Sequence, residues 1–187
     1  MRSYIEKRNA LILALSNFVG CPVLMASQVE PEMEPPFIVY SITSDYTPDN
    51  GLGNYSLEDG STEGTAVEVR EEQPTTTMSF TACSINRVEE KDGEQVSILG
   101  AAEALELATL AQGFFLHGGR YAIQKAGFVV VDVTNATSRD ALELDEMGRR
   151  FGFDVRLRYT RTDLAEVDTV TNVITKQKAV SYTHLRA

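Results

Sequence analysis

The side chains best suited to binding chemistry are three arginines, Arg150, Arg156 and Arg158, within one stretch of alternating apolar and polar residues. A guanidinium group keeps its charge at neutral pH and presents several N–H donors that match a carboxylate or a phosphate. The period of two over residues 150–159 predicts a half-buried strand. The arginines and Asp154 would lie on the outward face, which requires an acidic partner in this chain or another. The residues expected to face a core are Phe151, Phe153, Val155, Leu157 and Tyr159.

The composition is that of an acidic globular protein. The 187 residues are 43% hydrophobic and carry a formal net charge of −10. No apolar run is long enough to cross a bilayer, so we expect no membrane association. High-affinity binding to nucleic acid depends on Lys and Arg side chains that neutralise phosphates. We therefore expect no sequence-specific nucleic acid binding, and a chain that stays soluble by self-repulsion until it meets a specific partner.

Cysteine and histidine are too few and too scattered to suggest a metal centre. Cys21 and Cys83 lie far apart without C-x-x-C spacing, and we interpret both as reduced thiols. His117 precedes Gly118-Gly119, which is more typical of a helix C-terminus than of an esterase oxyanion loop, because the chain contains no G-x-S-x-G. No G-x-x-x-x-G-K is present to bind nucleotide phosphates. The sequence predicts a protein without enzymatic activity, cofactor or metal.

Two groups of acidic residues are candidate partners of the arginines. Glu68 and Glu71 lie in a predicted strand at residues 66–72, and opposite charges on neighbouring strands attract one another. Residues 45–65 are rich in glycine and acidic residues and have no apolar period. We expect them to form a long acidic loop that is either mobile or ordered against a partner. Its candidate interface residues are Asp49, Glu58, Asp59 and Glu63.

The remaining pattern predicts an α+β fold with a single mixed, mainly antiparallel sheet, on which an N-terminal helix and a long central helix pack. Ser3 and Glu6 have the spacing of a capping box, which predicts a first helix from Tyr4 to near Gly20. Alanines and leucines at three- and four-residue intervals predict the central helix over residues 95–116. The other predicted elements are strands at residues 23–25, 37–43, 66–72, 75–85, 128–133 and 150–159, a polar turn at 86–93 and a short helix at 121–126.

The pattern divides the chain into three parts. Residues 1–165 carry the periodic elements and would form the domain. Residues 166–180 contain a weaker apolar run, which fits either a strand or a helix of a C-terminal extension. Residues 181–187 fit none of the pattern, and we interpret them as an artefactual end of the reading frame.

Four short segments occur in an order and spacing that are more specific than any one of them alone. They are Arg8-Asn9-Ala10-Leu11, Asn50-Gly51-Leu52-Gly53-Asn54-Tyr55, Arg70-Glu71-Glu72-Gln73-Pro74-Thr75 and Gly152-Phe153-Asp154-Val155-Arg156. Together they resemble the neck or tail terminator proteins of tailed phages and prophages. The resemblance spans residues 4–162.

The resemblance implies a structural virion protein that forms a ring, commonly a hexamer, terminates the tail tube and joins it to the head connector. Its partners would be further copies of itself, the tail tube protein and a connector or stopper protein. It would reside in the neck or tail of the virion, and in the host cytoplasm during assembly. Arg150, Arg156 and Arg158 and the acidic residues would then lie at an interface with a neighbouring subunit or partner. The alternative is a small non-catalytic binding domain of a tail or connector component, whose long acidic loop grips a partner.

Overall fold

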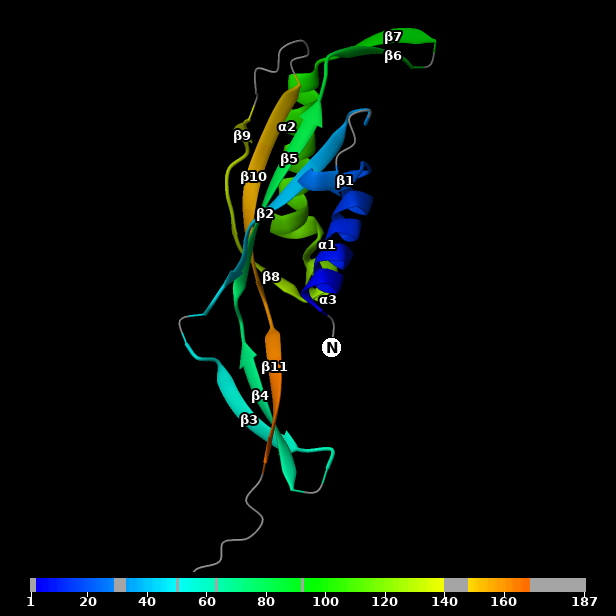
Figure 1. Cartoon of the computed structure of the whole chain (residues 1–187). Coiled ribbons are helices and arrows are strands. Elements are labelled where there is room, and N and C mark those ends of the chain that lie inside the picture. The colour runs from blue at the N-terminus through cyan, green and yellow to red at the C-terminus, as the bar shows by residue number, and fades with distance from the viewer. Residues whose placement is uncertain are drawn as a thin grey trace, which may run out of the picture. The chain divides into compact units, whose positions relative to one another are not determined.

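The computed structural model describes residues 3–28, 33–49, 51–62, 64–91, 93–139 and 148–168 (Figure 1). The chain forms two units. The larger unit comprises Met1–Gly53 and Glu72–Arg161, and the smaller unit comprises Asn54–Glu71 and Thr162–Ala187. Residues 169–187, which include most of the predicted extension and its tail, lie outside the described residues. Among the described helices, none has the length and apolar character needed to cross a membrane.

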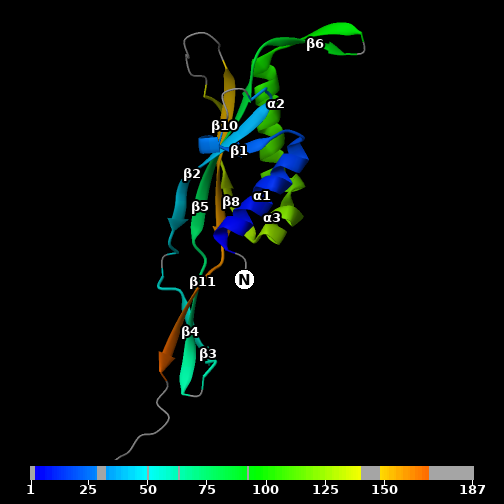
Figure 2. The ribbon, with the colours of Figure 1, turned by 45° about the vertical axis from the view of Figure 1, so that its right-hand side comes forward.

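A six-stranded sheet forms the centre of the larger unit, and helices cover one of its faces (Figures 1 and 2). The strand order is β1-β2-β5-β10-β8, with the short β9 also paired to β10. β1 runs parallel to β2, and the other pairs of this sheet are antiparallel. This mixed sheet confirms the predicted α+β class. The bounds are β1 Val23–Met25, β2 Phe37–Thr47, β5 Thr75–Ser84, β8 Phe128–Val133, β9 Thr137–Ser138 and β10 Arg149–Tyr159.

The first helix begins and ends as the sequence predicts. The Ser3 hydroxyl accepts a hydrogen bond from the Glu6 N–H at 3.2 Å, and the Glu6 carboxylate accepts one from the Ser3 N–H at 2.7 Å. Gly20, with a φ of 73°, supplies the left-handed residue that ends the helix. The helical segments are α1 Tyr4–Val19, the short 3-10 turn η1 Ala26–Gln28, α2 Gly100–Gly113, the π-helical turn η2 Phe114–Gly118 and α3 Arg120–Ala126.

Aromatic rings connect the sheet to the helices in the core. Phe80 of β5 stacks on Phe153 of β10 with ring centroids 5.7 Å apart. Phe115 of η2 contacts both rings, at 5.1 and 6.2 Å. The predicted half-buried strand is therefore confirmed, because its apolar side chains face this core. Phe153, Val155, Leu157 and Tyr159 are buried, and Phe151 packs against them.

The predicted start of the central helix is wrong. The helix begins at Gly100, whereas residues 95–98 belong to β7 (Glu94–Ile98), which pairs with β6 (Arg87–Lys91) in a hairpin. The predicted polar turn at residues 86–93 therefore holds β6 as well as the turn at Gly93, whose φ is 83°. The side chains of β7 are mostly exposed, so no burial pattern distinguishes this strand from the start of an amphipathic helix.

Residues 45–65 are more regular than the predicted acidic loop. β2 continues to Thr47, and β3 (Asn54–Asp59) pairs antiparallel with β4 (Thr65–Glu72). β11 (Arg161–Asp168) completes a three-stranded sheet in the order β11-β4-β3. Every residue of β3 is exposed, so the strand lacks the apolar alternation that reveals a half-buried strand.

Truncation of the central ring of the core should weaken the fold strongly. Phe153→Ala removes a side chain that is 1% exposed and stacks on Phe80. We expect the free energy of unfolding to fall by about 3–5 kcal/mol, as is typical when a buried aromatic ring is lost. Urea unfolding followed by circular dichroism measures this change. Tyr121 is 84% exposed, and Tyr121→Ala should change stability by less than about 0.5 kcal/mol. Equal losses in the two variants would contradict the described core.

Candidate assembly surfaces

The face of the main sheet opposite the helices is polar. Its central strand, β5, presents a row of half-buried hydroxyls and one thiol: Thr75, Thr77, Ser79, Thr81 and Cys83. The predicted outward residues of β10 lie beside this row, as follows from the period of two. In the observed register Arg150 lies opposite Cys83, Asp154 opposite Ser79, Arg156 opposite Thr77 and Arg158 opposite Thr75.

The three predicted arginines differ in their surroundings. Arg156 and Arg158 are exposed, and neither forms an ion pair with another described residue. Arg150 is half-buried and has interactions within the chain. Burial raises the pKa of the Cys83 thiol, and the charge of Arg150 opposes this rise. Of the three arginines on β10, Arg156 and Arg158 are therefore the best placed to meet a partner; we call Arg150, Arg156 and Arg158 the arginine row.

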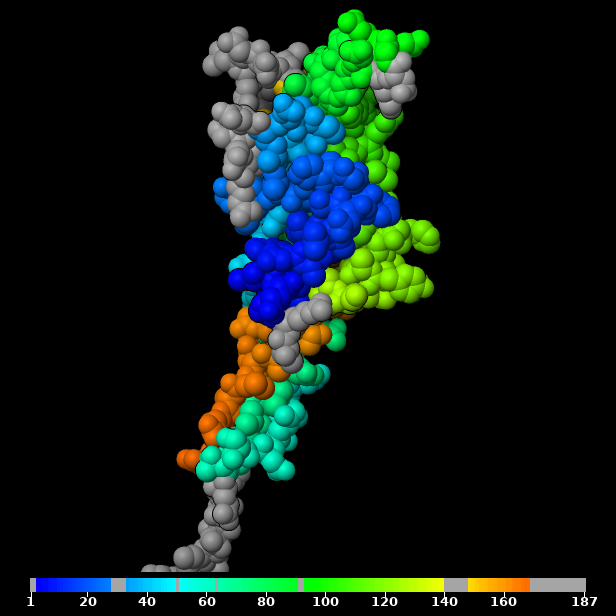
Figure 3. Space-filling view, turned by 90° about the vertical axis from the view of Figure 1, so that its right-hand side faces the viewer, coloured from blue at the N-terminus to red at the C-terminus, as the bar shows by residue number. Residues whose placement is uncertain are grey.

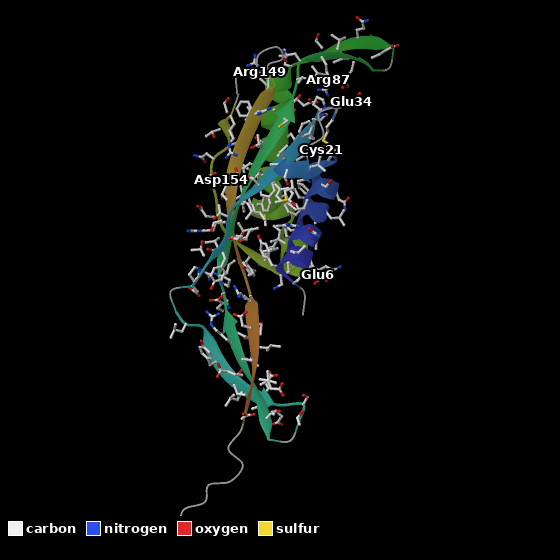
Figure 4. All side chains as sticks on the ribbon, viewed as in Figure 1. Glu6, Cys21, Glu34, Arg87, Arg149 and Asp154 are labelled. Carbon is white, nitrogen blue, oxygen red and sulfur yellow. The ribbon has the colours of Figure 1, made fainter. Side chains whose placement is uncertain are left out.

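A fourth arginine on this face escaped the sequence analysis. Arg139 follows β9, and its guanidinium group crosses β10 to donate hydrogen bonds to Ser79 at 2.6 Å and Thr81 at 3.0 Å. It also pairs with Asp154 at 2.9 Å, and Ser79 donates to the same carboxylate at 2.6 Å. Burial alone would raise the pKa of Asp154, but the hydrogen bonds from Ser79 and Arg139 hold it below its usual range. Figure 4 labels Asp154, the centre of this network, on β10.

Gly152 makes this crossing possible. A Cβ atom at Gly152 would lie 2.6 Å from Nε of Arg139, so any other residue would displace the guanidinium group. In the sequence, Gly152 stands where the alternation of β10 would place a polar side chain. A glycine in such a position indicates that another group packs closely against the strand, which here is the Arg139 side chain. The segment Gly-Phe-Asp-Val-Arg thus provides space, core contacts, a carboxylate for the network and an exposed arginine in succession. These residues are Gly152, Phe153, Asp154, Val155 and Arg156.

The smaller unit is strongly acidic. Its described residues carry seven acidic side chains and one basic side chain, Arg70, which leaves a net charge of −6. Arg70 pairs with Asp163 at 2.9 Å. Tyr55 and Leu57 of β3 are 55% and 68% exposed, so apolar groups accompany the charges. The acidic residues are Glu58, Asp59, Glu68, Glu71, Asp163, Glu166 and Asp168.

The predicted acidic partners do not lie on a strand next to the arginine strand. Glu68 and Glu71 are on β4, whose neighbours are β3 and β11, whereas β10 pairs with β5, β8 and β9. Asp49 lies after β2, where its backbone carbonyl accepts a hydrogen bond from the Gly51 N–H at 2.6 Å. Glu58 and Asp59 are exposed on β3, and Glu63 lies outside the described residues.

Figure 3 shows the surface of the larger unit on the side where α1, α2 and α3 lie, and several apolar side chains are exposed on these helices. Phe18 of α1 and Leu105 and Leu110 of α2 are 41–44% exposed and line an open hollow. This hollow also contains His117 and Glu106 but is otherwise apolar or uncharged. No group of His, Cys, Asp and Glu within the described residues is arranged to hold a metal ion. The surface is therefore better suited to packing against protein than to acid–base chemistry.

The two cysteines are both free thiols. Burial raises the pKa of Cys21 to about 11 and also raises the pKa of Cys83. Both side chains are therefore protonated near neutral pH. Protonated thiols are poor nucleophiles, so neither cysteine has the activation that a catalytic residue requires.

Substitution of Gly152 should break the arginine network without harming the core. We expect Gly152→Ala to displace the Arg139 side chain and lower the free energy of unfolding by about 1–2 kcal/mol, because charged hydrogen bonds are lost. In an Arg139→Ala background the same change should be neutral within about 0.5 kcal/mol, since nothing remains to be displaced. Thermal unfolding of the four proteins of this double-mutant cycle measures the coupling. An equal cost of Gly152→Ala in both backgrounds would show that the glycine serves another purpose.

The comparison with known proteins identifies the family of the chain. The chain matches the family described as phage neck terminator protein over residues 9–179. No curated protein matches it. The family match covers most of the chain and includes β10, the hairpin and the acidic sheet. The resemblance inferred from four short segments is thereby confirmed, and the chain belongs to the phage neck terminator proteins, which are structural proteins of tail assembly.

Proposed function

We propose that this protein assembles head to tail into a closed ring, the hexamer that the resemblance implies, which terminates the tail tube and joins it to the head connector. The family match supports a structural role at the neck. The open sheet face carries the further argument, because Arg156 and Arg158 are exposed on an otherwise strongly acidic chain. Its partners are then other copies of the chain, the tail tube protein and a connector or stopper protein. Assembly takes place in the host cytoplasm.

The ring contact joins the arginine row of one copy to acidic residues of the next. A ring needs a heterologous interface, in which one patch of each subunit meets a different patch of its neighbour. Complementary charges accelerate such an encounter and disfavour wrong pairings. Arg150, Arg156 and Arg158 form the basic patch. The acidic candidates predicted from the sequence are Asp49, Glu58, Asp59, Glu63, Glu68 and Glu71.

The acidic smaller unit also suits a position along the path of DNA. Its net charge of −6 over the described residues would repel phosphates, so that DNA passes without adhering. A second candidate function is that of a non-catalytic binding domain, whose acidic strands grip another neck or tail protein. The exposed Tyr55 and Leu57 favour this second function, because they share one face of β3 with Asp59. The two functions differ in whether the protein closes a ring on its own.

The molar mass in solution tests the ring. We expect light scattering to show a closed oligomer for the purified protein and folded monomers for Arg156→Glu/Arg158→Glu, because the reversed charges repel the acidic patch. Arg156→Lys/Arg158→Lys keeps the charge and should retain the oligomer. The melting temperature of each monomer reports whether it is folded. A wild-type chain that stays monomeric at every concentration would favour the binding domain.

Charge reversal in the smaller unit tests its position along the DNA path. If these residues lie along the DNA path and not in the ring contact, Glu58→Lys/Asp59→Lys should keep the oligomer by light scattering but lower the titre of a phage that depends on the variant gene by at least about tenfold, because lysines attract phosphates. Glu58→Gln/Asp59→Asn removes the charge without adding attraction and should reduce the titre less. Unchanged titres in both variants would count against contact with DNA.

A further inference from the structure

The β6–β7 hairpin is exposed on both faces. Val88 and Val96 are 62% and 43% exposed. Val88 lies opposite Ser97 and Val96 opposite Glu89, so the two valines are on opposite faces of the hairpin. A two-stranded hairpin is at best marginally stable in water without support. Its order must therefore come from its attachment or from a surface that covers it.

An ion pair holds the base of the hairpin to α2. Arg87 donates hydrogen bonds to the two carboxylate oxygens of Glu103 at 2.6 and 2.8 Å, and Ser84 donates to the same carboxylate. The hydrogen bond from Arg87 is the main cause that holds the pKa of Glu103 below its usual range. A bidentate arginine–carboxylate pair fixes direction as well as distance. Figure 4 labels Arg87 at the point where the hairpin leaves the main sheet.

The start of α2 fixes the hairpin a second time. The Asn86 side chain accepts a hydrogen bond from the Gly100 N–H at 2.8 Å. A Cβ atom at Gly100 would lie 2.6 Å from the backbone carbonyl carbon of Ile85, so the helix packs directly on the backbone that enters the hairpin. Residues 84–87, where the chain enters the hairpin, are thus tied at several points to the first turn of α2. An interaction surface held in this way loses little entropy on binding.

The hairpin and the arginine row face opposite ways. The hairpin extends on the helix side of the main sheet (Figures 1 and 2). Arg156 and Arg158 belong to the polar side of β10, on the other face. A head-to-tail contact needs two different patches on opposite sides of each subunit. These two features of the larger unit meet that requirement.

Their charges are also complementary. Glu90 and Glu94 flank the turn of the hairpin and are exposed, and no ion pair or side-chain hydrogen bond joins either of them to another described residue. Glu90 lies opposite Gln95 and Glu94 opposite Lys91, so the two carboxylates extend from opposite faces at the tip of the hairpin. Glu89 is already engaged by Arg87 at 2.6 Å. The apolar groups match as well, because Val129, which lies opposite Arg158 on β8, is 60% exposed at the border of the open face.

We infer that the β6–β7 hairpin of one copy docks by its tip on the open sheet face of the next copy, where Glu90 and Glu94, which extend from opposite faces beside the turn, meet Arg156 and Arg158. The inference rests on the proposed ring and names the acidic patch that this ring uses. It assigns the hairpin, which was absent from the acidic candidates predicted from the sequence, to the subunit contact. The acidic smaller unit then serves the DNA path or an axial partner instead.

Charge exchange tests the docking. Glu90→Lys/Glu94→Lys should give folded monomers by light scattering, at concentrations at least about tenfold above those at which the wild type assembles. Arg156→Glu/Arg158→Glu should do the same. The variant that combines all four changes should recover the oligomer, because each contact again joins opposite charges. Thermal unfolding checks that each protein retains its fold.

The outcomes separate this docking from the ring itself. Oligomers of Glu90→Lys/Glu94→Lys with wild-type affinity would overturn the docking and leave the ring intact. The docking would also be overturned if the variant with all four changes is folded but stays monomeric. The matched control Glu58→Lys/Asp59→Lys should retain the oligomer, and its loss would assign the contact to the smaller unit. A monomeric wild type would contradict the ring, whatever the variants do.

Discussion

The rest of the structure depends on the alternation of β10 between an apolar and a polar face. Val155 and Leu157 are fully buried and Phe153 is 1% exposed, whereas the residues between them carry charge. A shift of the register by one residue would place Asp154 and Arg156 in the core, so the pairing with β5 and β8 is strongly fixed. The helices cover only the apolar face. The charges of the other face must therefore be met by water, by a network within the chain or by a partner.

The sequence predicted those parts of the fold that pack on this core. The first helix was recognisable from its capping residues, and β5 and β10 from their period of two. β3 and the β6–β7 hairpin were missed because their side chains are exposed, so no alternation of burial marks them. Arg139 was missed for another reason: its contact with Asp154 depends on tertiary packing over Gly152. Of that network, the sequence displayed only a glycine in an otherwise regular strand.

The missed strands have a common physical property. β3 and the hairpin are mostly exposed on the described chain, and both present acidic and apolar side chains together. Strands of this kind have edges with unpaired backbone groups, to which a strand of another chain can pair. Charged side chains limit unspecific pairing of this type. An exposed strand stabilises its own fold little, and its side chains remain accessible to a partner. The parts that were hardest to predict are thus the parts best suited to contact a partner.

The net charge of −10 determines how such contacts become specific. At physiological ionic strength the screening length is about 8 Å, so charges outside an interface interact weakly, whereas charges in direct contact interact strongly. Two copies brought together in an arbitrary orientation juxtapose acidic surfaces and gain nothing. An orientation that sets Arg156 and Arg158 against carboxylates would turn this repulsion into attraction. In the proposed ring, the exposed arginines of an otherwise acidic chain would thus favour one defined orientation over the others.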